Sequence, residues 1–366
     1  MGERDIGGVG MNKFITLYPA NWLYNAAVIG FLRVIAYGKG EEVIDKWLSD
    51  NGTVTIERGI FSESVAFYKG YNKHKGEKEL PLVGKNKRYP NYLQSGEESA
   101  FEDYSKNLSN IKEEGIACGI CSRNFSIDFS QFNDKTKKIA ERITSNIQVI
   151  HNSLIGPSKG EFPNSFWNLN YSISICPLCA YLIIHHHIPF ESAQTQNGQI
   201  FINAPSFKIM WHLNKFVEQI FSKSKGYQVR QILGISFIEL AQKVAVTLGA
   251  WSIMNIEMVI KRGNEIEYYS LPYEISRLLL QKDIASLISA TKEPLILEII
   301  LNGKFSHLLT LSHKILRYSI TETNAFNDKY LSQLRNKDTK SLKILSNILP
   351  ELYTRINSII SREVMI

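Results

Sequence analysis

Four cysteines, arranged as two Cys-x-x-Cys pairs, are the residues of this chain whose type and spacing best suit chemistry. Cys118 and Cys121 form the first pair, Cys176 and Cys179 form the second, and 54 residues lie between the pairs. No other cysteine occurs among the 366 residues. A two-residue spacer lets a tight turn direct both sulfur atoms at one ion, and four thiolates complete a tetrahedral shell around Zn²⁺. The pattern predicts a structural zinc site with no open coordination position.

Other uses of these thiols remain as alternatives. A redox dithiol of the thioredoxin kind needs one motif that follows a strand of a βαβ unit, and neither pair has that context. Structural disulfides would imply an oxidising compartment, whereas we recognise no secretory leader ahead of the pairs. The last alternative is four unrelated buried thiols. The spacer exceeds the about 15 to 20 residues of a compact zinc ribbon, so we expect a ribbon that carries an insertion.

Three consecutive histidines, His185, His186 and His187, follow the second pair. Histidine ligands on one helix lie at positions i and i+4, so three neighbours cannot all reach one ion from a regular helix. We therefore expect contacts with a helix end or with a polyanion, and a ligand role is the alternative. A helix that starts at the second cysteine pair would place that pair near the positive amide ends, which favours thiolate.

The composition is that of a soluble protein of two or three domains, with 44% hydrophobic residues. A formal net charge of +7 and an isoelectric point near 9.0 favour polyanionic partners over acidic substrates. The stretch from Phe14 to Leu32 has no charged residue and the length of a membrane span, but it contains Pro19 and Asn25. We expect a buried helix there and a cytoplasmic protein.

Residues 68–92 form a basic segment in which tyrosines are interleaved with lysines. Its glycines and prolines predict a loop or loose hairpin. Mobile cations next to flat rings suit a phosphodiester backbone and unpaired bases, whereas the simpler interpretation is a solvated loop that keeps the protein soluble. The predicted nucleic-acid contacts are Lys69, Lys73, Lys75, Lys85, Lys87 and Arg88.

The hydrophobic pattern around these candidates predicts an α+β fold. We expect a mixed N-terminal region over residues 1–110, a zinc-binding subdomain inserted at 111–190, a continuation of the mixed region over 191–270, and a helical bundle over 271–366. The predicted elements are a helix capped by Asn21, strands at 53–58 and 199–203, helices at 133–154, from Ser206 and at 229–248, a hairpin at 251–269, and about five helices from Tyr273, with breaks near Pro294, Asn302-Gly303, Asn324 and Pro350.

The motifs of common enzymes are missing from the sequence. It contains no GxxxxGK[ST] loop, no GxGxxG that opens a βαβ unit, no HExxH and no GxSxG. A clustered acidic set of the kind used by two-metal nucleases is also lacking. Binding is therefore favoured over catalysis, and we expect a protein that is not an enzyme.

Together with the early Asn21-Trp22 helix and the Ile200–Asn203 strand before a helix, the two cysteine pairs resemble the CRISPR-associated CXXC-CXXC family. These proteins are the large subunits of type I-B Cascade, the Cas-eight-b group. The resemblance covers Met11 to about Tyr273, and its specific part is the two cysteine pairs.

The resemblance implies a non-catalytic subunit at the crRNA 5′-handle end of an RNA-guided complex, beside the Cas-five and Cas-seven backbone subunits. Such a subunit reads a PAM in double-stranded target DNA, supports the R-loop with its displaced single strand, and recruits the helicase-nuclease in antiviral defence. The C-terminal bundle would then match the small subunit. The alternatives are a zinc-containing nucleic-acid-binding regulator outside CRISPR, a dithiol oxidoreductase, or a nuclease whose site is assembled from scattered residues.

Overall fold

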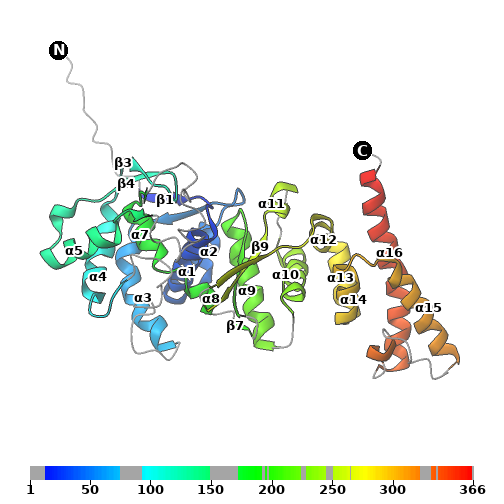
Figure 1. The fold of residues 1–366 in the computed structure, drawn as a ribbon. Helices are drawn as coiled ribbons and strands as arrows, with labels where there is room; N and C mark the ends of the chain where they lie inside the picture. Colours follow the sequence, from blue (N-terminus) through cyan, green and yellow to red (C-terminus); the bar gives the residue numbers. More distant parts are fainter. Residues whose placement is uncertain are drawn as a thin grey trace, which may run out of the picture. The chain divides into compact units, whose positions relative to one another are not determined.

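The computed structural model describes most of the chain and divides into two compact units, which we treat separately (Figure 1). The described residues are 13–74, 93–148, 172–191, 194–195, 198–223, 228–244, 250–263, 265–321, 331–334 and 337–364. The first unit comprises the described residues of Met1–Gln194, Gly198–Trp211 and Val259–Glu267, and the second those of Thr195–Asn197, His212–Met258 and Tyr268–Ile366.

Helix α1 (Trp22–Lys39) is the centre of the first unit. The Asn21 side chain caps it by accepting from the amide of Tyr24 at 3.0 Å. Apolar residues occupy nearly all faces of α1, so helices pack around it on several sides (Figure 1). The other helices of this unit are α2 (Glu41–Trp47), α3 (Ile60–His74), α4 (Glu98–Asn107), α5 (Asp134–Ile143), α7 (Pro177–Ile183) and α8 (Ile188–Glu191), with short 3₁₀ turns η1 (Leu108–Asn110) and η2 (Phe129–Gln131).

The described strands form small sheets. Strands β1 and β2 pair antiparallel, with Ile15 opposite Ile56, and both of these side chains are buried. A four-stranded sheet has the order β10-β9-β8-β7, and two further hairpin-like pairs are β3 with β4 and β5 with β6. The bounds are β1 (Phe14–Leu17), β2 (Val54–Glu57), β3 (Lys112–Ala117), β4 (Asn124–Ser126), β5 (Ile147–Gln148), β6 (Ser172–Ile173), β7 (Gln194–Thr195), β8 (Gly198–Asn203), β9 (Glu257–Arg262) and β10 (Glu265–Tyr269).

A buried amide links α1 to the four-stranded sheet. The side chain of Asn25, which is 1% exposed, donates to Oδ1 of Asn203 at 2.8 Å and exchanges hydrogen bonds with the backbone of Ala20. Both the oxygen and the nitrogen of this amide have hydrogen-bond partners, so the desolvation cost of its burial is offset. The hydrogen bond to Asn203 fixes the position of α1 against β8.

The second unit is largely helical. Helices α15 and α16 lie side by side, and α13 packs against both α10 and α16 (Figure 1). The helices from residue 207 onward are α9 (Phe207–Lys223), α10 (Val229–Lys243), α11 (Ala250–Met254), α12 (Tyr273–Leu279), α13 (Lys282–Thr291), α14 (Pro294–Leu301), α15 (Ser306–Thr321) and α16 (Thr339–Val364), with a 3₁₀ turn η4 (Leu331–Leu334) before α16.

The structure confirms the mixed α+β class with a helical C-terminal region. It confirms the cap at Asn21, the strands at 53–58 and 199–203, and a helix that begins just after Ser206, whose hydroxyl accepts from the amide of Ile209 at 3.3 Å. It also confirms a hairpin that turns at Gly263. The predicted domain boundaries stay predictions.

Several predicted elements were wrong. The uncharged stretch from Phe14 is a strand before it is a helix, because β1 pairs with β2. Ile147 belongs to strand β5, which pairs with Ile173, and Ile253 lies in helix α11 rather than in the hairpin. Among the described helices, none combines the length and the apolar character that crossing a membrane requires.

Pro350 does not break the last helix, contrary to prediction. Proline has no amide hydrogen, so the carbonyl of Ser346, four residues earlier, loses its helical donor. The hydroxyl of Ser312 on α15 donates to this carbonyl at 2.7 Å. The neighbouring helix therefore replaces the missing hydrogen bond, and α16 continues through the proline to Val364.

Candidate metal centre

The two cysteine pairs converge on one point within the first unit. All four Sγ atoms lie within 4.8 Å of one another. The Sγ atoms of Cys121 and Cys176, one from each pair, are 3.8 Å apart. Cys118, Cys176 and Cys179 are buried, and Cys121 is partly exposed. Within the part of the chain that the structure describes, this is the one group of histidine, cysteine or acidic side chains close enough together to hold a metal ion.

The first pair occupies the turn of the β3–β4 hairpin. The amide of Cys118 donates to the carbonyl of Arg123 at 2.9 Å, and the amide of Ser122 donates back to the carbonyl of Cys118 at 2.8 Å. Ser122 adopts φ +58°, which bends the chain sharply after the second cysteine. The turn therefore presents both sulfur atoms on one side, as the two-residue spacer predicts.

The second pair occupies the start of helix α7. Cys176 is the N-cap residue, Pro177 takes the first helical position, and the amide of Cys179 donates to Sγ of Cys176 at 3.4 Å. The positive end of a helix favours a thiolate over a thiol, so this position suits metal ligands. The sequence prediction of a helix that opens at this pair is confirmed.

Backbone contacts join the two half-sites. The amide of Cys176 donates to Sγ of Cys118 at 3.3 Å, and the amide of Gly119 donates to the carbonyl of Ser174 at 2.8 Å. The Ser174 hydroxyl donates to the carbonyl of Ala117 at 2.6 Å. A side chain at position 119 would meet Cγ2 of Ile173 at 2.3 Å, so this close approach requires glycine.

The sulfur geometry fits a tetrahedral metal ion. Four Zn–S bonds of about 2.3 Å place sulfur atoms about 3.8 Å apart, whereas a disulfide needs about 2.05 Å. The separation between Cys121 and Cys176 matches the first value, and all four cysteines are free thiols. Four close cysteines can thus hold a metal ion such as zinc, with every coordination position taken by the protein.

Each of the four sulfur atoms affects the protonation of its neighbours. Hydrogen bonds from the other three thiols lower the pKa of Cys118 far below its ordinary value. Burial is the largest cause that raises the pKa of Cys179, where hydrogen bonds with the other cysteines act in the same direction. The protein alone lowers the pKa of Cys118 and Cys121 and raises the pKa of Cys176 and Cys179, since further like charges would be buried together. A divalent cation removes this conflict, because it allows all four sulfur atoms to ionise.

Buried residues hold α7 in place behind the cluster. The hydroxyl of Tyr104 on α4 donates to the carbonyl of Pro177 at 2.9 Å. Tyr24 of α1 is 1% exposed, and burial raises its pKa well above the ordinary value, with the nearby cysteine sulfurs adding to that rise. The cysteine cluster is therefore anchored to the core of the first unit through Tyr104, and Tyr24 is buried nearby.

Arg123 is a residue of the site that the sequence reasoning missed. It follows the first cysteine pair by two positions, donates to the carbonyl of Thr16, and contacts Glu113 at 3.1 Å. Its guanidinium lies 4.6 Å from the centre of the Phe125 ring. These contacts attach the cysteine hairpin to β1, and a single arginine after a Cys-x-x-Cys motif gives no local signal of such a role.

The three histidines are buried in the core and do not belong to the cysteine cluster. His185, His186 and His187 are 0%, 3% and 2% exposed, so the predicted contact with a polyanion is wrong. The predicted helix-end contact is confirmed, because Nδ1 of His185 lies 3.1 Å from the carbonyls of Tyr181 and Leu182 at the end of α7.

The basic segment is partly helical, which corrects the prediction of a loop from residue 68. Helix α3 continues to His74 and contains Lys69 and Lys73, although their side chains lie outside the described part of the structure. Tyr68, expected as a stacking surface, is fully buried. Its hydroxyl hydrogen-bonds within the core instead. The remaining candidates, Lys75, Lys85, Lys87 and Arg88, lie outside the described residues.

The comparisons with known proteins give no match. No family model, no curated protein and no solved structure matches the chain. The class that the geometry itself defines is a protein with a closed tetracysteine centre built from a hairpin turn and a helix start.

Proposed function

We propose that the four cysteines bind one Zn²⁺ as a structural centre. The observation that carries this proposal is the convergence of four free sulfur atoms, at spacings that suit tetrahedral coordination and with backbone amides donating to two of them. When bound, the ion supplies charge neutralisation and a link between the β3–β4 hairpin and α7. No position is left for a substrate, so the centre is structural rather than catalytic.

The wider proposal is a non-catalytic, nucleic-acid-binding large subunit of a type I-B Cascade complex. Its support is the resemblance of the two cysteine pairs to the CXXC-CXXC family, the net charge of +7, and the basic segment at 68–92. In this role the zinc centre stiffens a scaffold that holds positively charged side chains against the crRNA 5′ handle and the target DNA. Sequence discrimination would come from guide pairing, and the protein would read the PAM and the backbone.

Metal analysis of the purified protein tests the first proposal. We expect close to one zinc per chain, and loss of that zinc in Cys176→Ala and Cys179→Ala. A matched control is Leu182→Ala, which removes a buried side chain from the same helix without touching a ligand. Full zinc content in the cysteine variants, or a metal-free wild type with two disulfides, would contradict the proposal.

Co-purification tests the second proposal. A Cascade subunit expressed with its genomic neighbours and a CRISPR array should purify with crRNA and several other subunits, whereas a stand-alone regulator or an oxidoreductase should purify without guide RNA. Recovery of the protein alone, with its zinc intact, would refute the Cascade assignment and leave the zinc proposal standing.

Charge reversal tests the basic segment. Lys75→Glu/Lys85→Glu/Lys87→Glu should weaken binding to any RNA or DNA sequence. The slope of log affinity against log salt should fall by about one for each lysine that no longer pairs with a phosphate. The control is Lys46→Glu/Lys137→Glu/Lys138→Glu, three exposed lysines on α2 and α5. Equal effects of the two triple variants would show that only net charge matters.

A further inference from the structure

Cys121 differs from the other three cysteines in its exposure. Its side chain is partly exposed, whereas Cys118, Cys176 and Cys179 are 2%, 3% and 0% exposed. It lies in the turn of the β3–β4 hairpin, where its neighbour Ser122 is exposed as well. A small molecule from the solvent can therefore reach one sulfur atom of the cluster before the others.

Backbone amides shield the sulfur atoms of Cys118 and Cys176. Sγ of Cys118 accepts from the amide of Ile120 at 3.4 Å and from the amide of Cys176 at 3.3 Å. Sγ of Cys176 accepts from the amide of Cys179 at 3.4 Å. Each such hydrogen bond withdraws charge from a thiolate and makes it a weaker nucleophile.

The sulfur atom of Cys121 has no such shield. Within the part of the chain that the structure describes, no amide donates to it, and its polar contact is with Sγ of Cys176. The sulfur atom of Cys179 also lacks an amide donor, but this residue is fully buried. Cys121 is therefore the cysteine that combines access from solvent with an unshielded sulfur atom.

A second sulfur atom lies within reach of Cys121. Sγ of Cys176 is 3.8 Å away and belongs to the other half-site. A disulfide requires about 2.05 Å, so the two atoms would have to approach by about 1.8 Å. Cys176 is fixed as the N-cap residue of α7, whereas Cys121 lies in a surface turn. We expect the turn to supply this movement.

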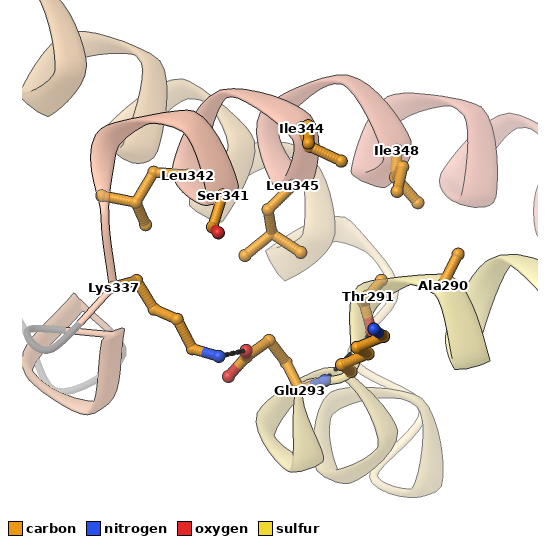
Figure 2. A pocket seen from close by; sticks show the side chains of 10 residues that line it. Ala290, Thr291, Glu293, Lys337, Ser341, Leu342, Ile344, Leu345 and Ile348 are labelled. Atoms are coloured by element: carbon orange, nitrogen blue, oxygen red, sulfur yellow. Dashed lines mark hydrogen bonds and ion pairs between the residues drawn. The ribbon is translucent and has the colours of Figure 1, made fainter.

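The hollow beside α16 offers no comparable chemistry. It lies between the end of α13, the start of α14 and the first turns of α16, and its described lining contains no thiol and no imidazole (Figure 2). The carboxylate of Glu293 in this lining pairs with Lys337 (Figure 2). Because all four cysteines of the chain belong to the cluster, oxidation of a thiolate can occur only there.

We propose that Cys121 is an oxidation site for hydrogen peroxide, and that its oxidation releases the structural ion through a disulfide with Cys176. The proposal rests on the zinc site proposed above, since the bound ion keeps the four sulfur atoms as thiolates. In the first step, the Cys121 thiolate attacks one oxygen of the peroxide. An S–O bond forms, the O–O bond breaks and hydroxide leaves, so that Cys121 becomes a sulfenic acid.

In the second step, the Cys176 thiolate attacks the sulfur atom of this sulfenic acid. An S–S bond forms, the S–O bond breaks and a second hydroxide leaves. Two electrons from the two thiolates have then reduced one peroxide to two hydroxide ions. Cys118 and Cys179 are the thiolate ligands that remain, and two sulfur atoms cannot complete the tetrahedral shell, so the protein loses its zinc.

The test uses the full-length, zinc-loaded protein, whose metal content is measured first. Hydrogen peroxide is added in steps, a chromogenic indicator measures the released zinc, and mass spectrometry after alkylation locates the oxidised cysteines. We expect about one zinc released and two thiols lost for each peroxide consumed, with a disulfide that joins Cys121 to Cys176. When dimedone is present to trap sulfenic acids, the adduct should form first on Cys121. A reductant with added zinc should restore the metal content.

Two controls separate this reaction from other oxidation. Met254→Leu removes a methionine that is 65% exposed, and it should release zinc like the wild type. Catalase added before the peroxide should abolish the release. The proposal is overturned, with the zinc site intact, if excess peroxide releases no zinc, if dimedone labels another cysteine first, or if the disulfide forms within one Cys-x-x-Cys pair. A protein that purifies without zinc would refute the structural ion and this proposal together.

Discussion

The hydroxyl oxygen of Tyr68 lies 2.9 Å from Nε2 of His185, although 117 residues separate them in the sequence. The other ring nitrogen of His185, Nδ1, faces two backbone carbonyls at 3.1 Å. Carbonyl oxygens only accept hydrogen bonds, so Nδ1 carries the proton of the neutral imidazole. Nε2 therefore accepts a hydrogen bond from the Tyr68 hydroxyl. The hydroxyl of Tyr181 also contacts Tyr68, and it lies 2.9 Å from the hydroxyl of Ser64. This buried network joins α3 to the helix that carries the second cysteine pair.

Removing the Tyr68 hydroxyl should destabilise the protein. Tyr68→Phe leaves Nε2 of His185 buried without its donor, which costs about 1–3 kcal/mol in the free energy of unfolding. Urea denaturation measures this difference. The control Tyr18→Phe removes the hydroxyl of a ring that is 55% exposed, and it should change the stability by less than about 0.5 kcal/mol. Equal stabilities of the two variants would show that the network contributes nothing.

Acid should destabilise the protein through His185. Burial lowers the pKa of this imidazole to about 4, whereas the unfolded chain has an ordinary value of about 6.5. Below pH 6.5 the unfolded state therefore binds a proton on His185 that the folded state does not bind. The free energy of unfolding falls as the pH decreases, until it levels off near pH 4. The full loss is about 3 kcal/mol.

Comparison with His185→Gln isolates this contribution from other acid effects, such as protonation of the cysteines. The wild type should lose stability relative to the variant as the pH is lowered from 7 to 5, in urea titrations at fixed zinc concentration. A stability difference that does not change over this pH range would mean that His185 binds its proton equally well in both states.

Gly30 allows α1 to approach the end of α7 very closely. A Cβ atom at position 30 would lie 2.2 Å from the carbonyl oxygen of His185, a backbone atom that cannot swing aside. Gly30→Ala should therefore lower the unfolding free energy by about 1–3 kcal/mol, as expected of overpacking. Gly59→Ala is the matched control, because nothing lies within 4 Å of its added methyl group. Thermal denaturation of the two variants compares them directly.

Removal of the metal should lower the melting temperature and make the cysteines reactive. With a strong chelator and a reductant at neutral pH, we expect all four thiols to react with a thiol reagent, whereas the untreated protein should react slowly. Added zinc should restore the melting temperature of the wild type and of Leu182→Ala, but not of Cys179→Ala. A melting temperature that the chelator leaves unchanged would argue against a structural ion.

The cysteine site was predictable because its signal is local. A Cys-x-x-Cys spacing fixes the direction of two sulfur atoms within one turn, so the pairs point to a shared ion without knowledge of the fold. The cap at Asn21 and the strand at 199–203 were predictable for the same reason. Each depends on residues within a few positions of one another.

Most of the interactions that the sequence reasoning missed join residues that are distant in the sequence. Tyr68 looked like a surface aromatic because lysines surround it, yet its partners are Tyr181 and His185, more than 110 residues away. Pro350 looked like a helix end because its substitute donor, Ser312, belongs to another helix. Hydrophobic periodicity and residue propensity contain no information about such partners. The predictions for Tyr68 and Pro350 therefore failed where tertiary contacts replaced local ones.

The proposed zinc centre is divided between two distant segments, and this division would affect how the ion is acquired during biosynthesis. The hairpin with Cys118 and Cys121 leaves the ribosome well before α7, since 54 residues separate the pairs. Until Cys176 and Cys179 emerge, the nascent chain offers an ion only two of the four sulfur ligands. Stable capture of the proposed ion would therefore wait for the second pair, and a loaded ion would indicate that the surrounding core is complete.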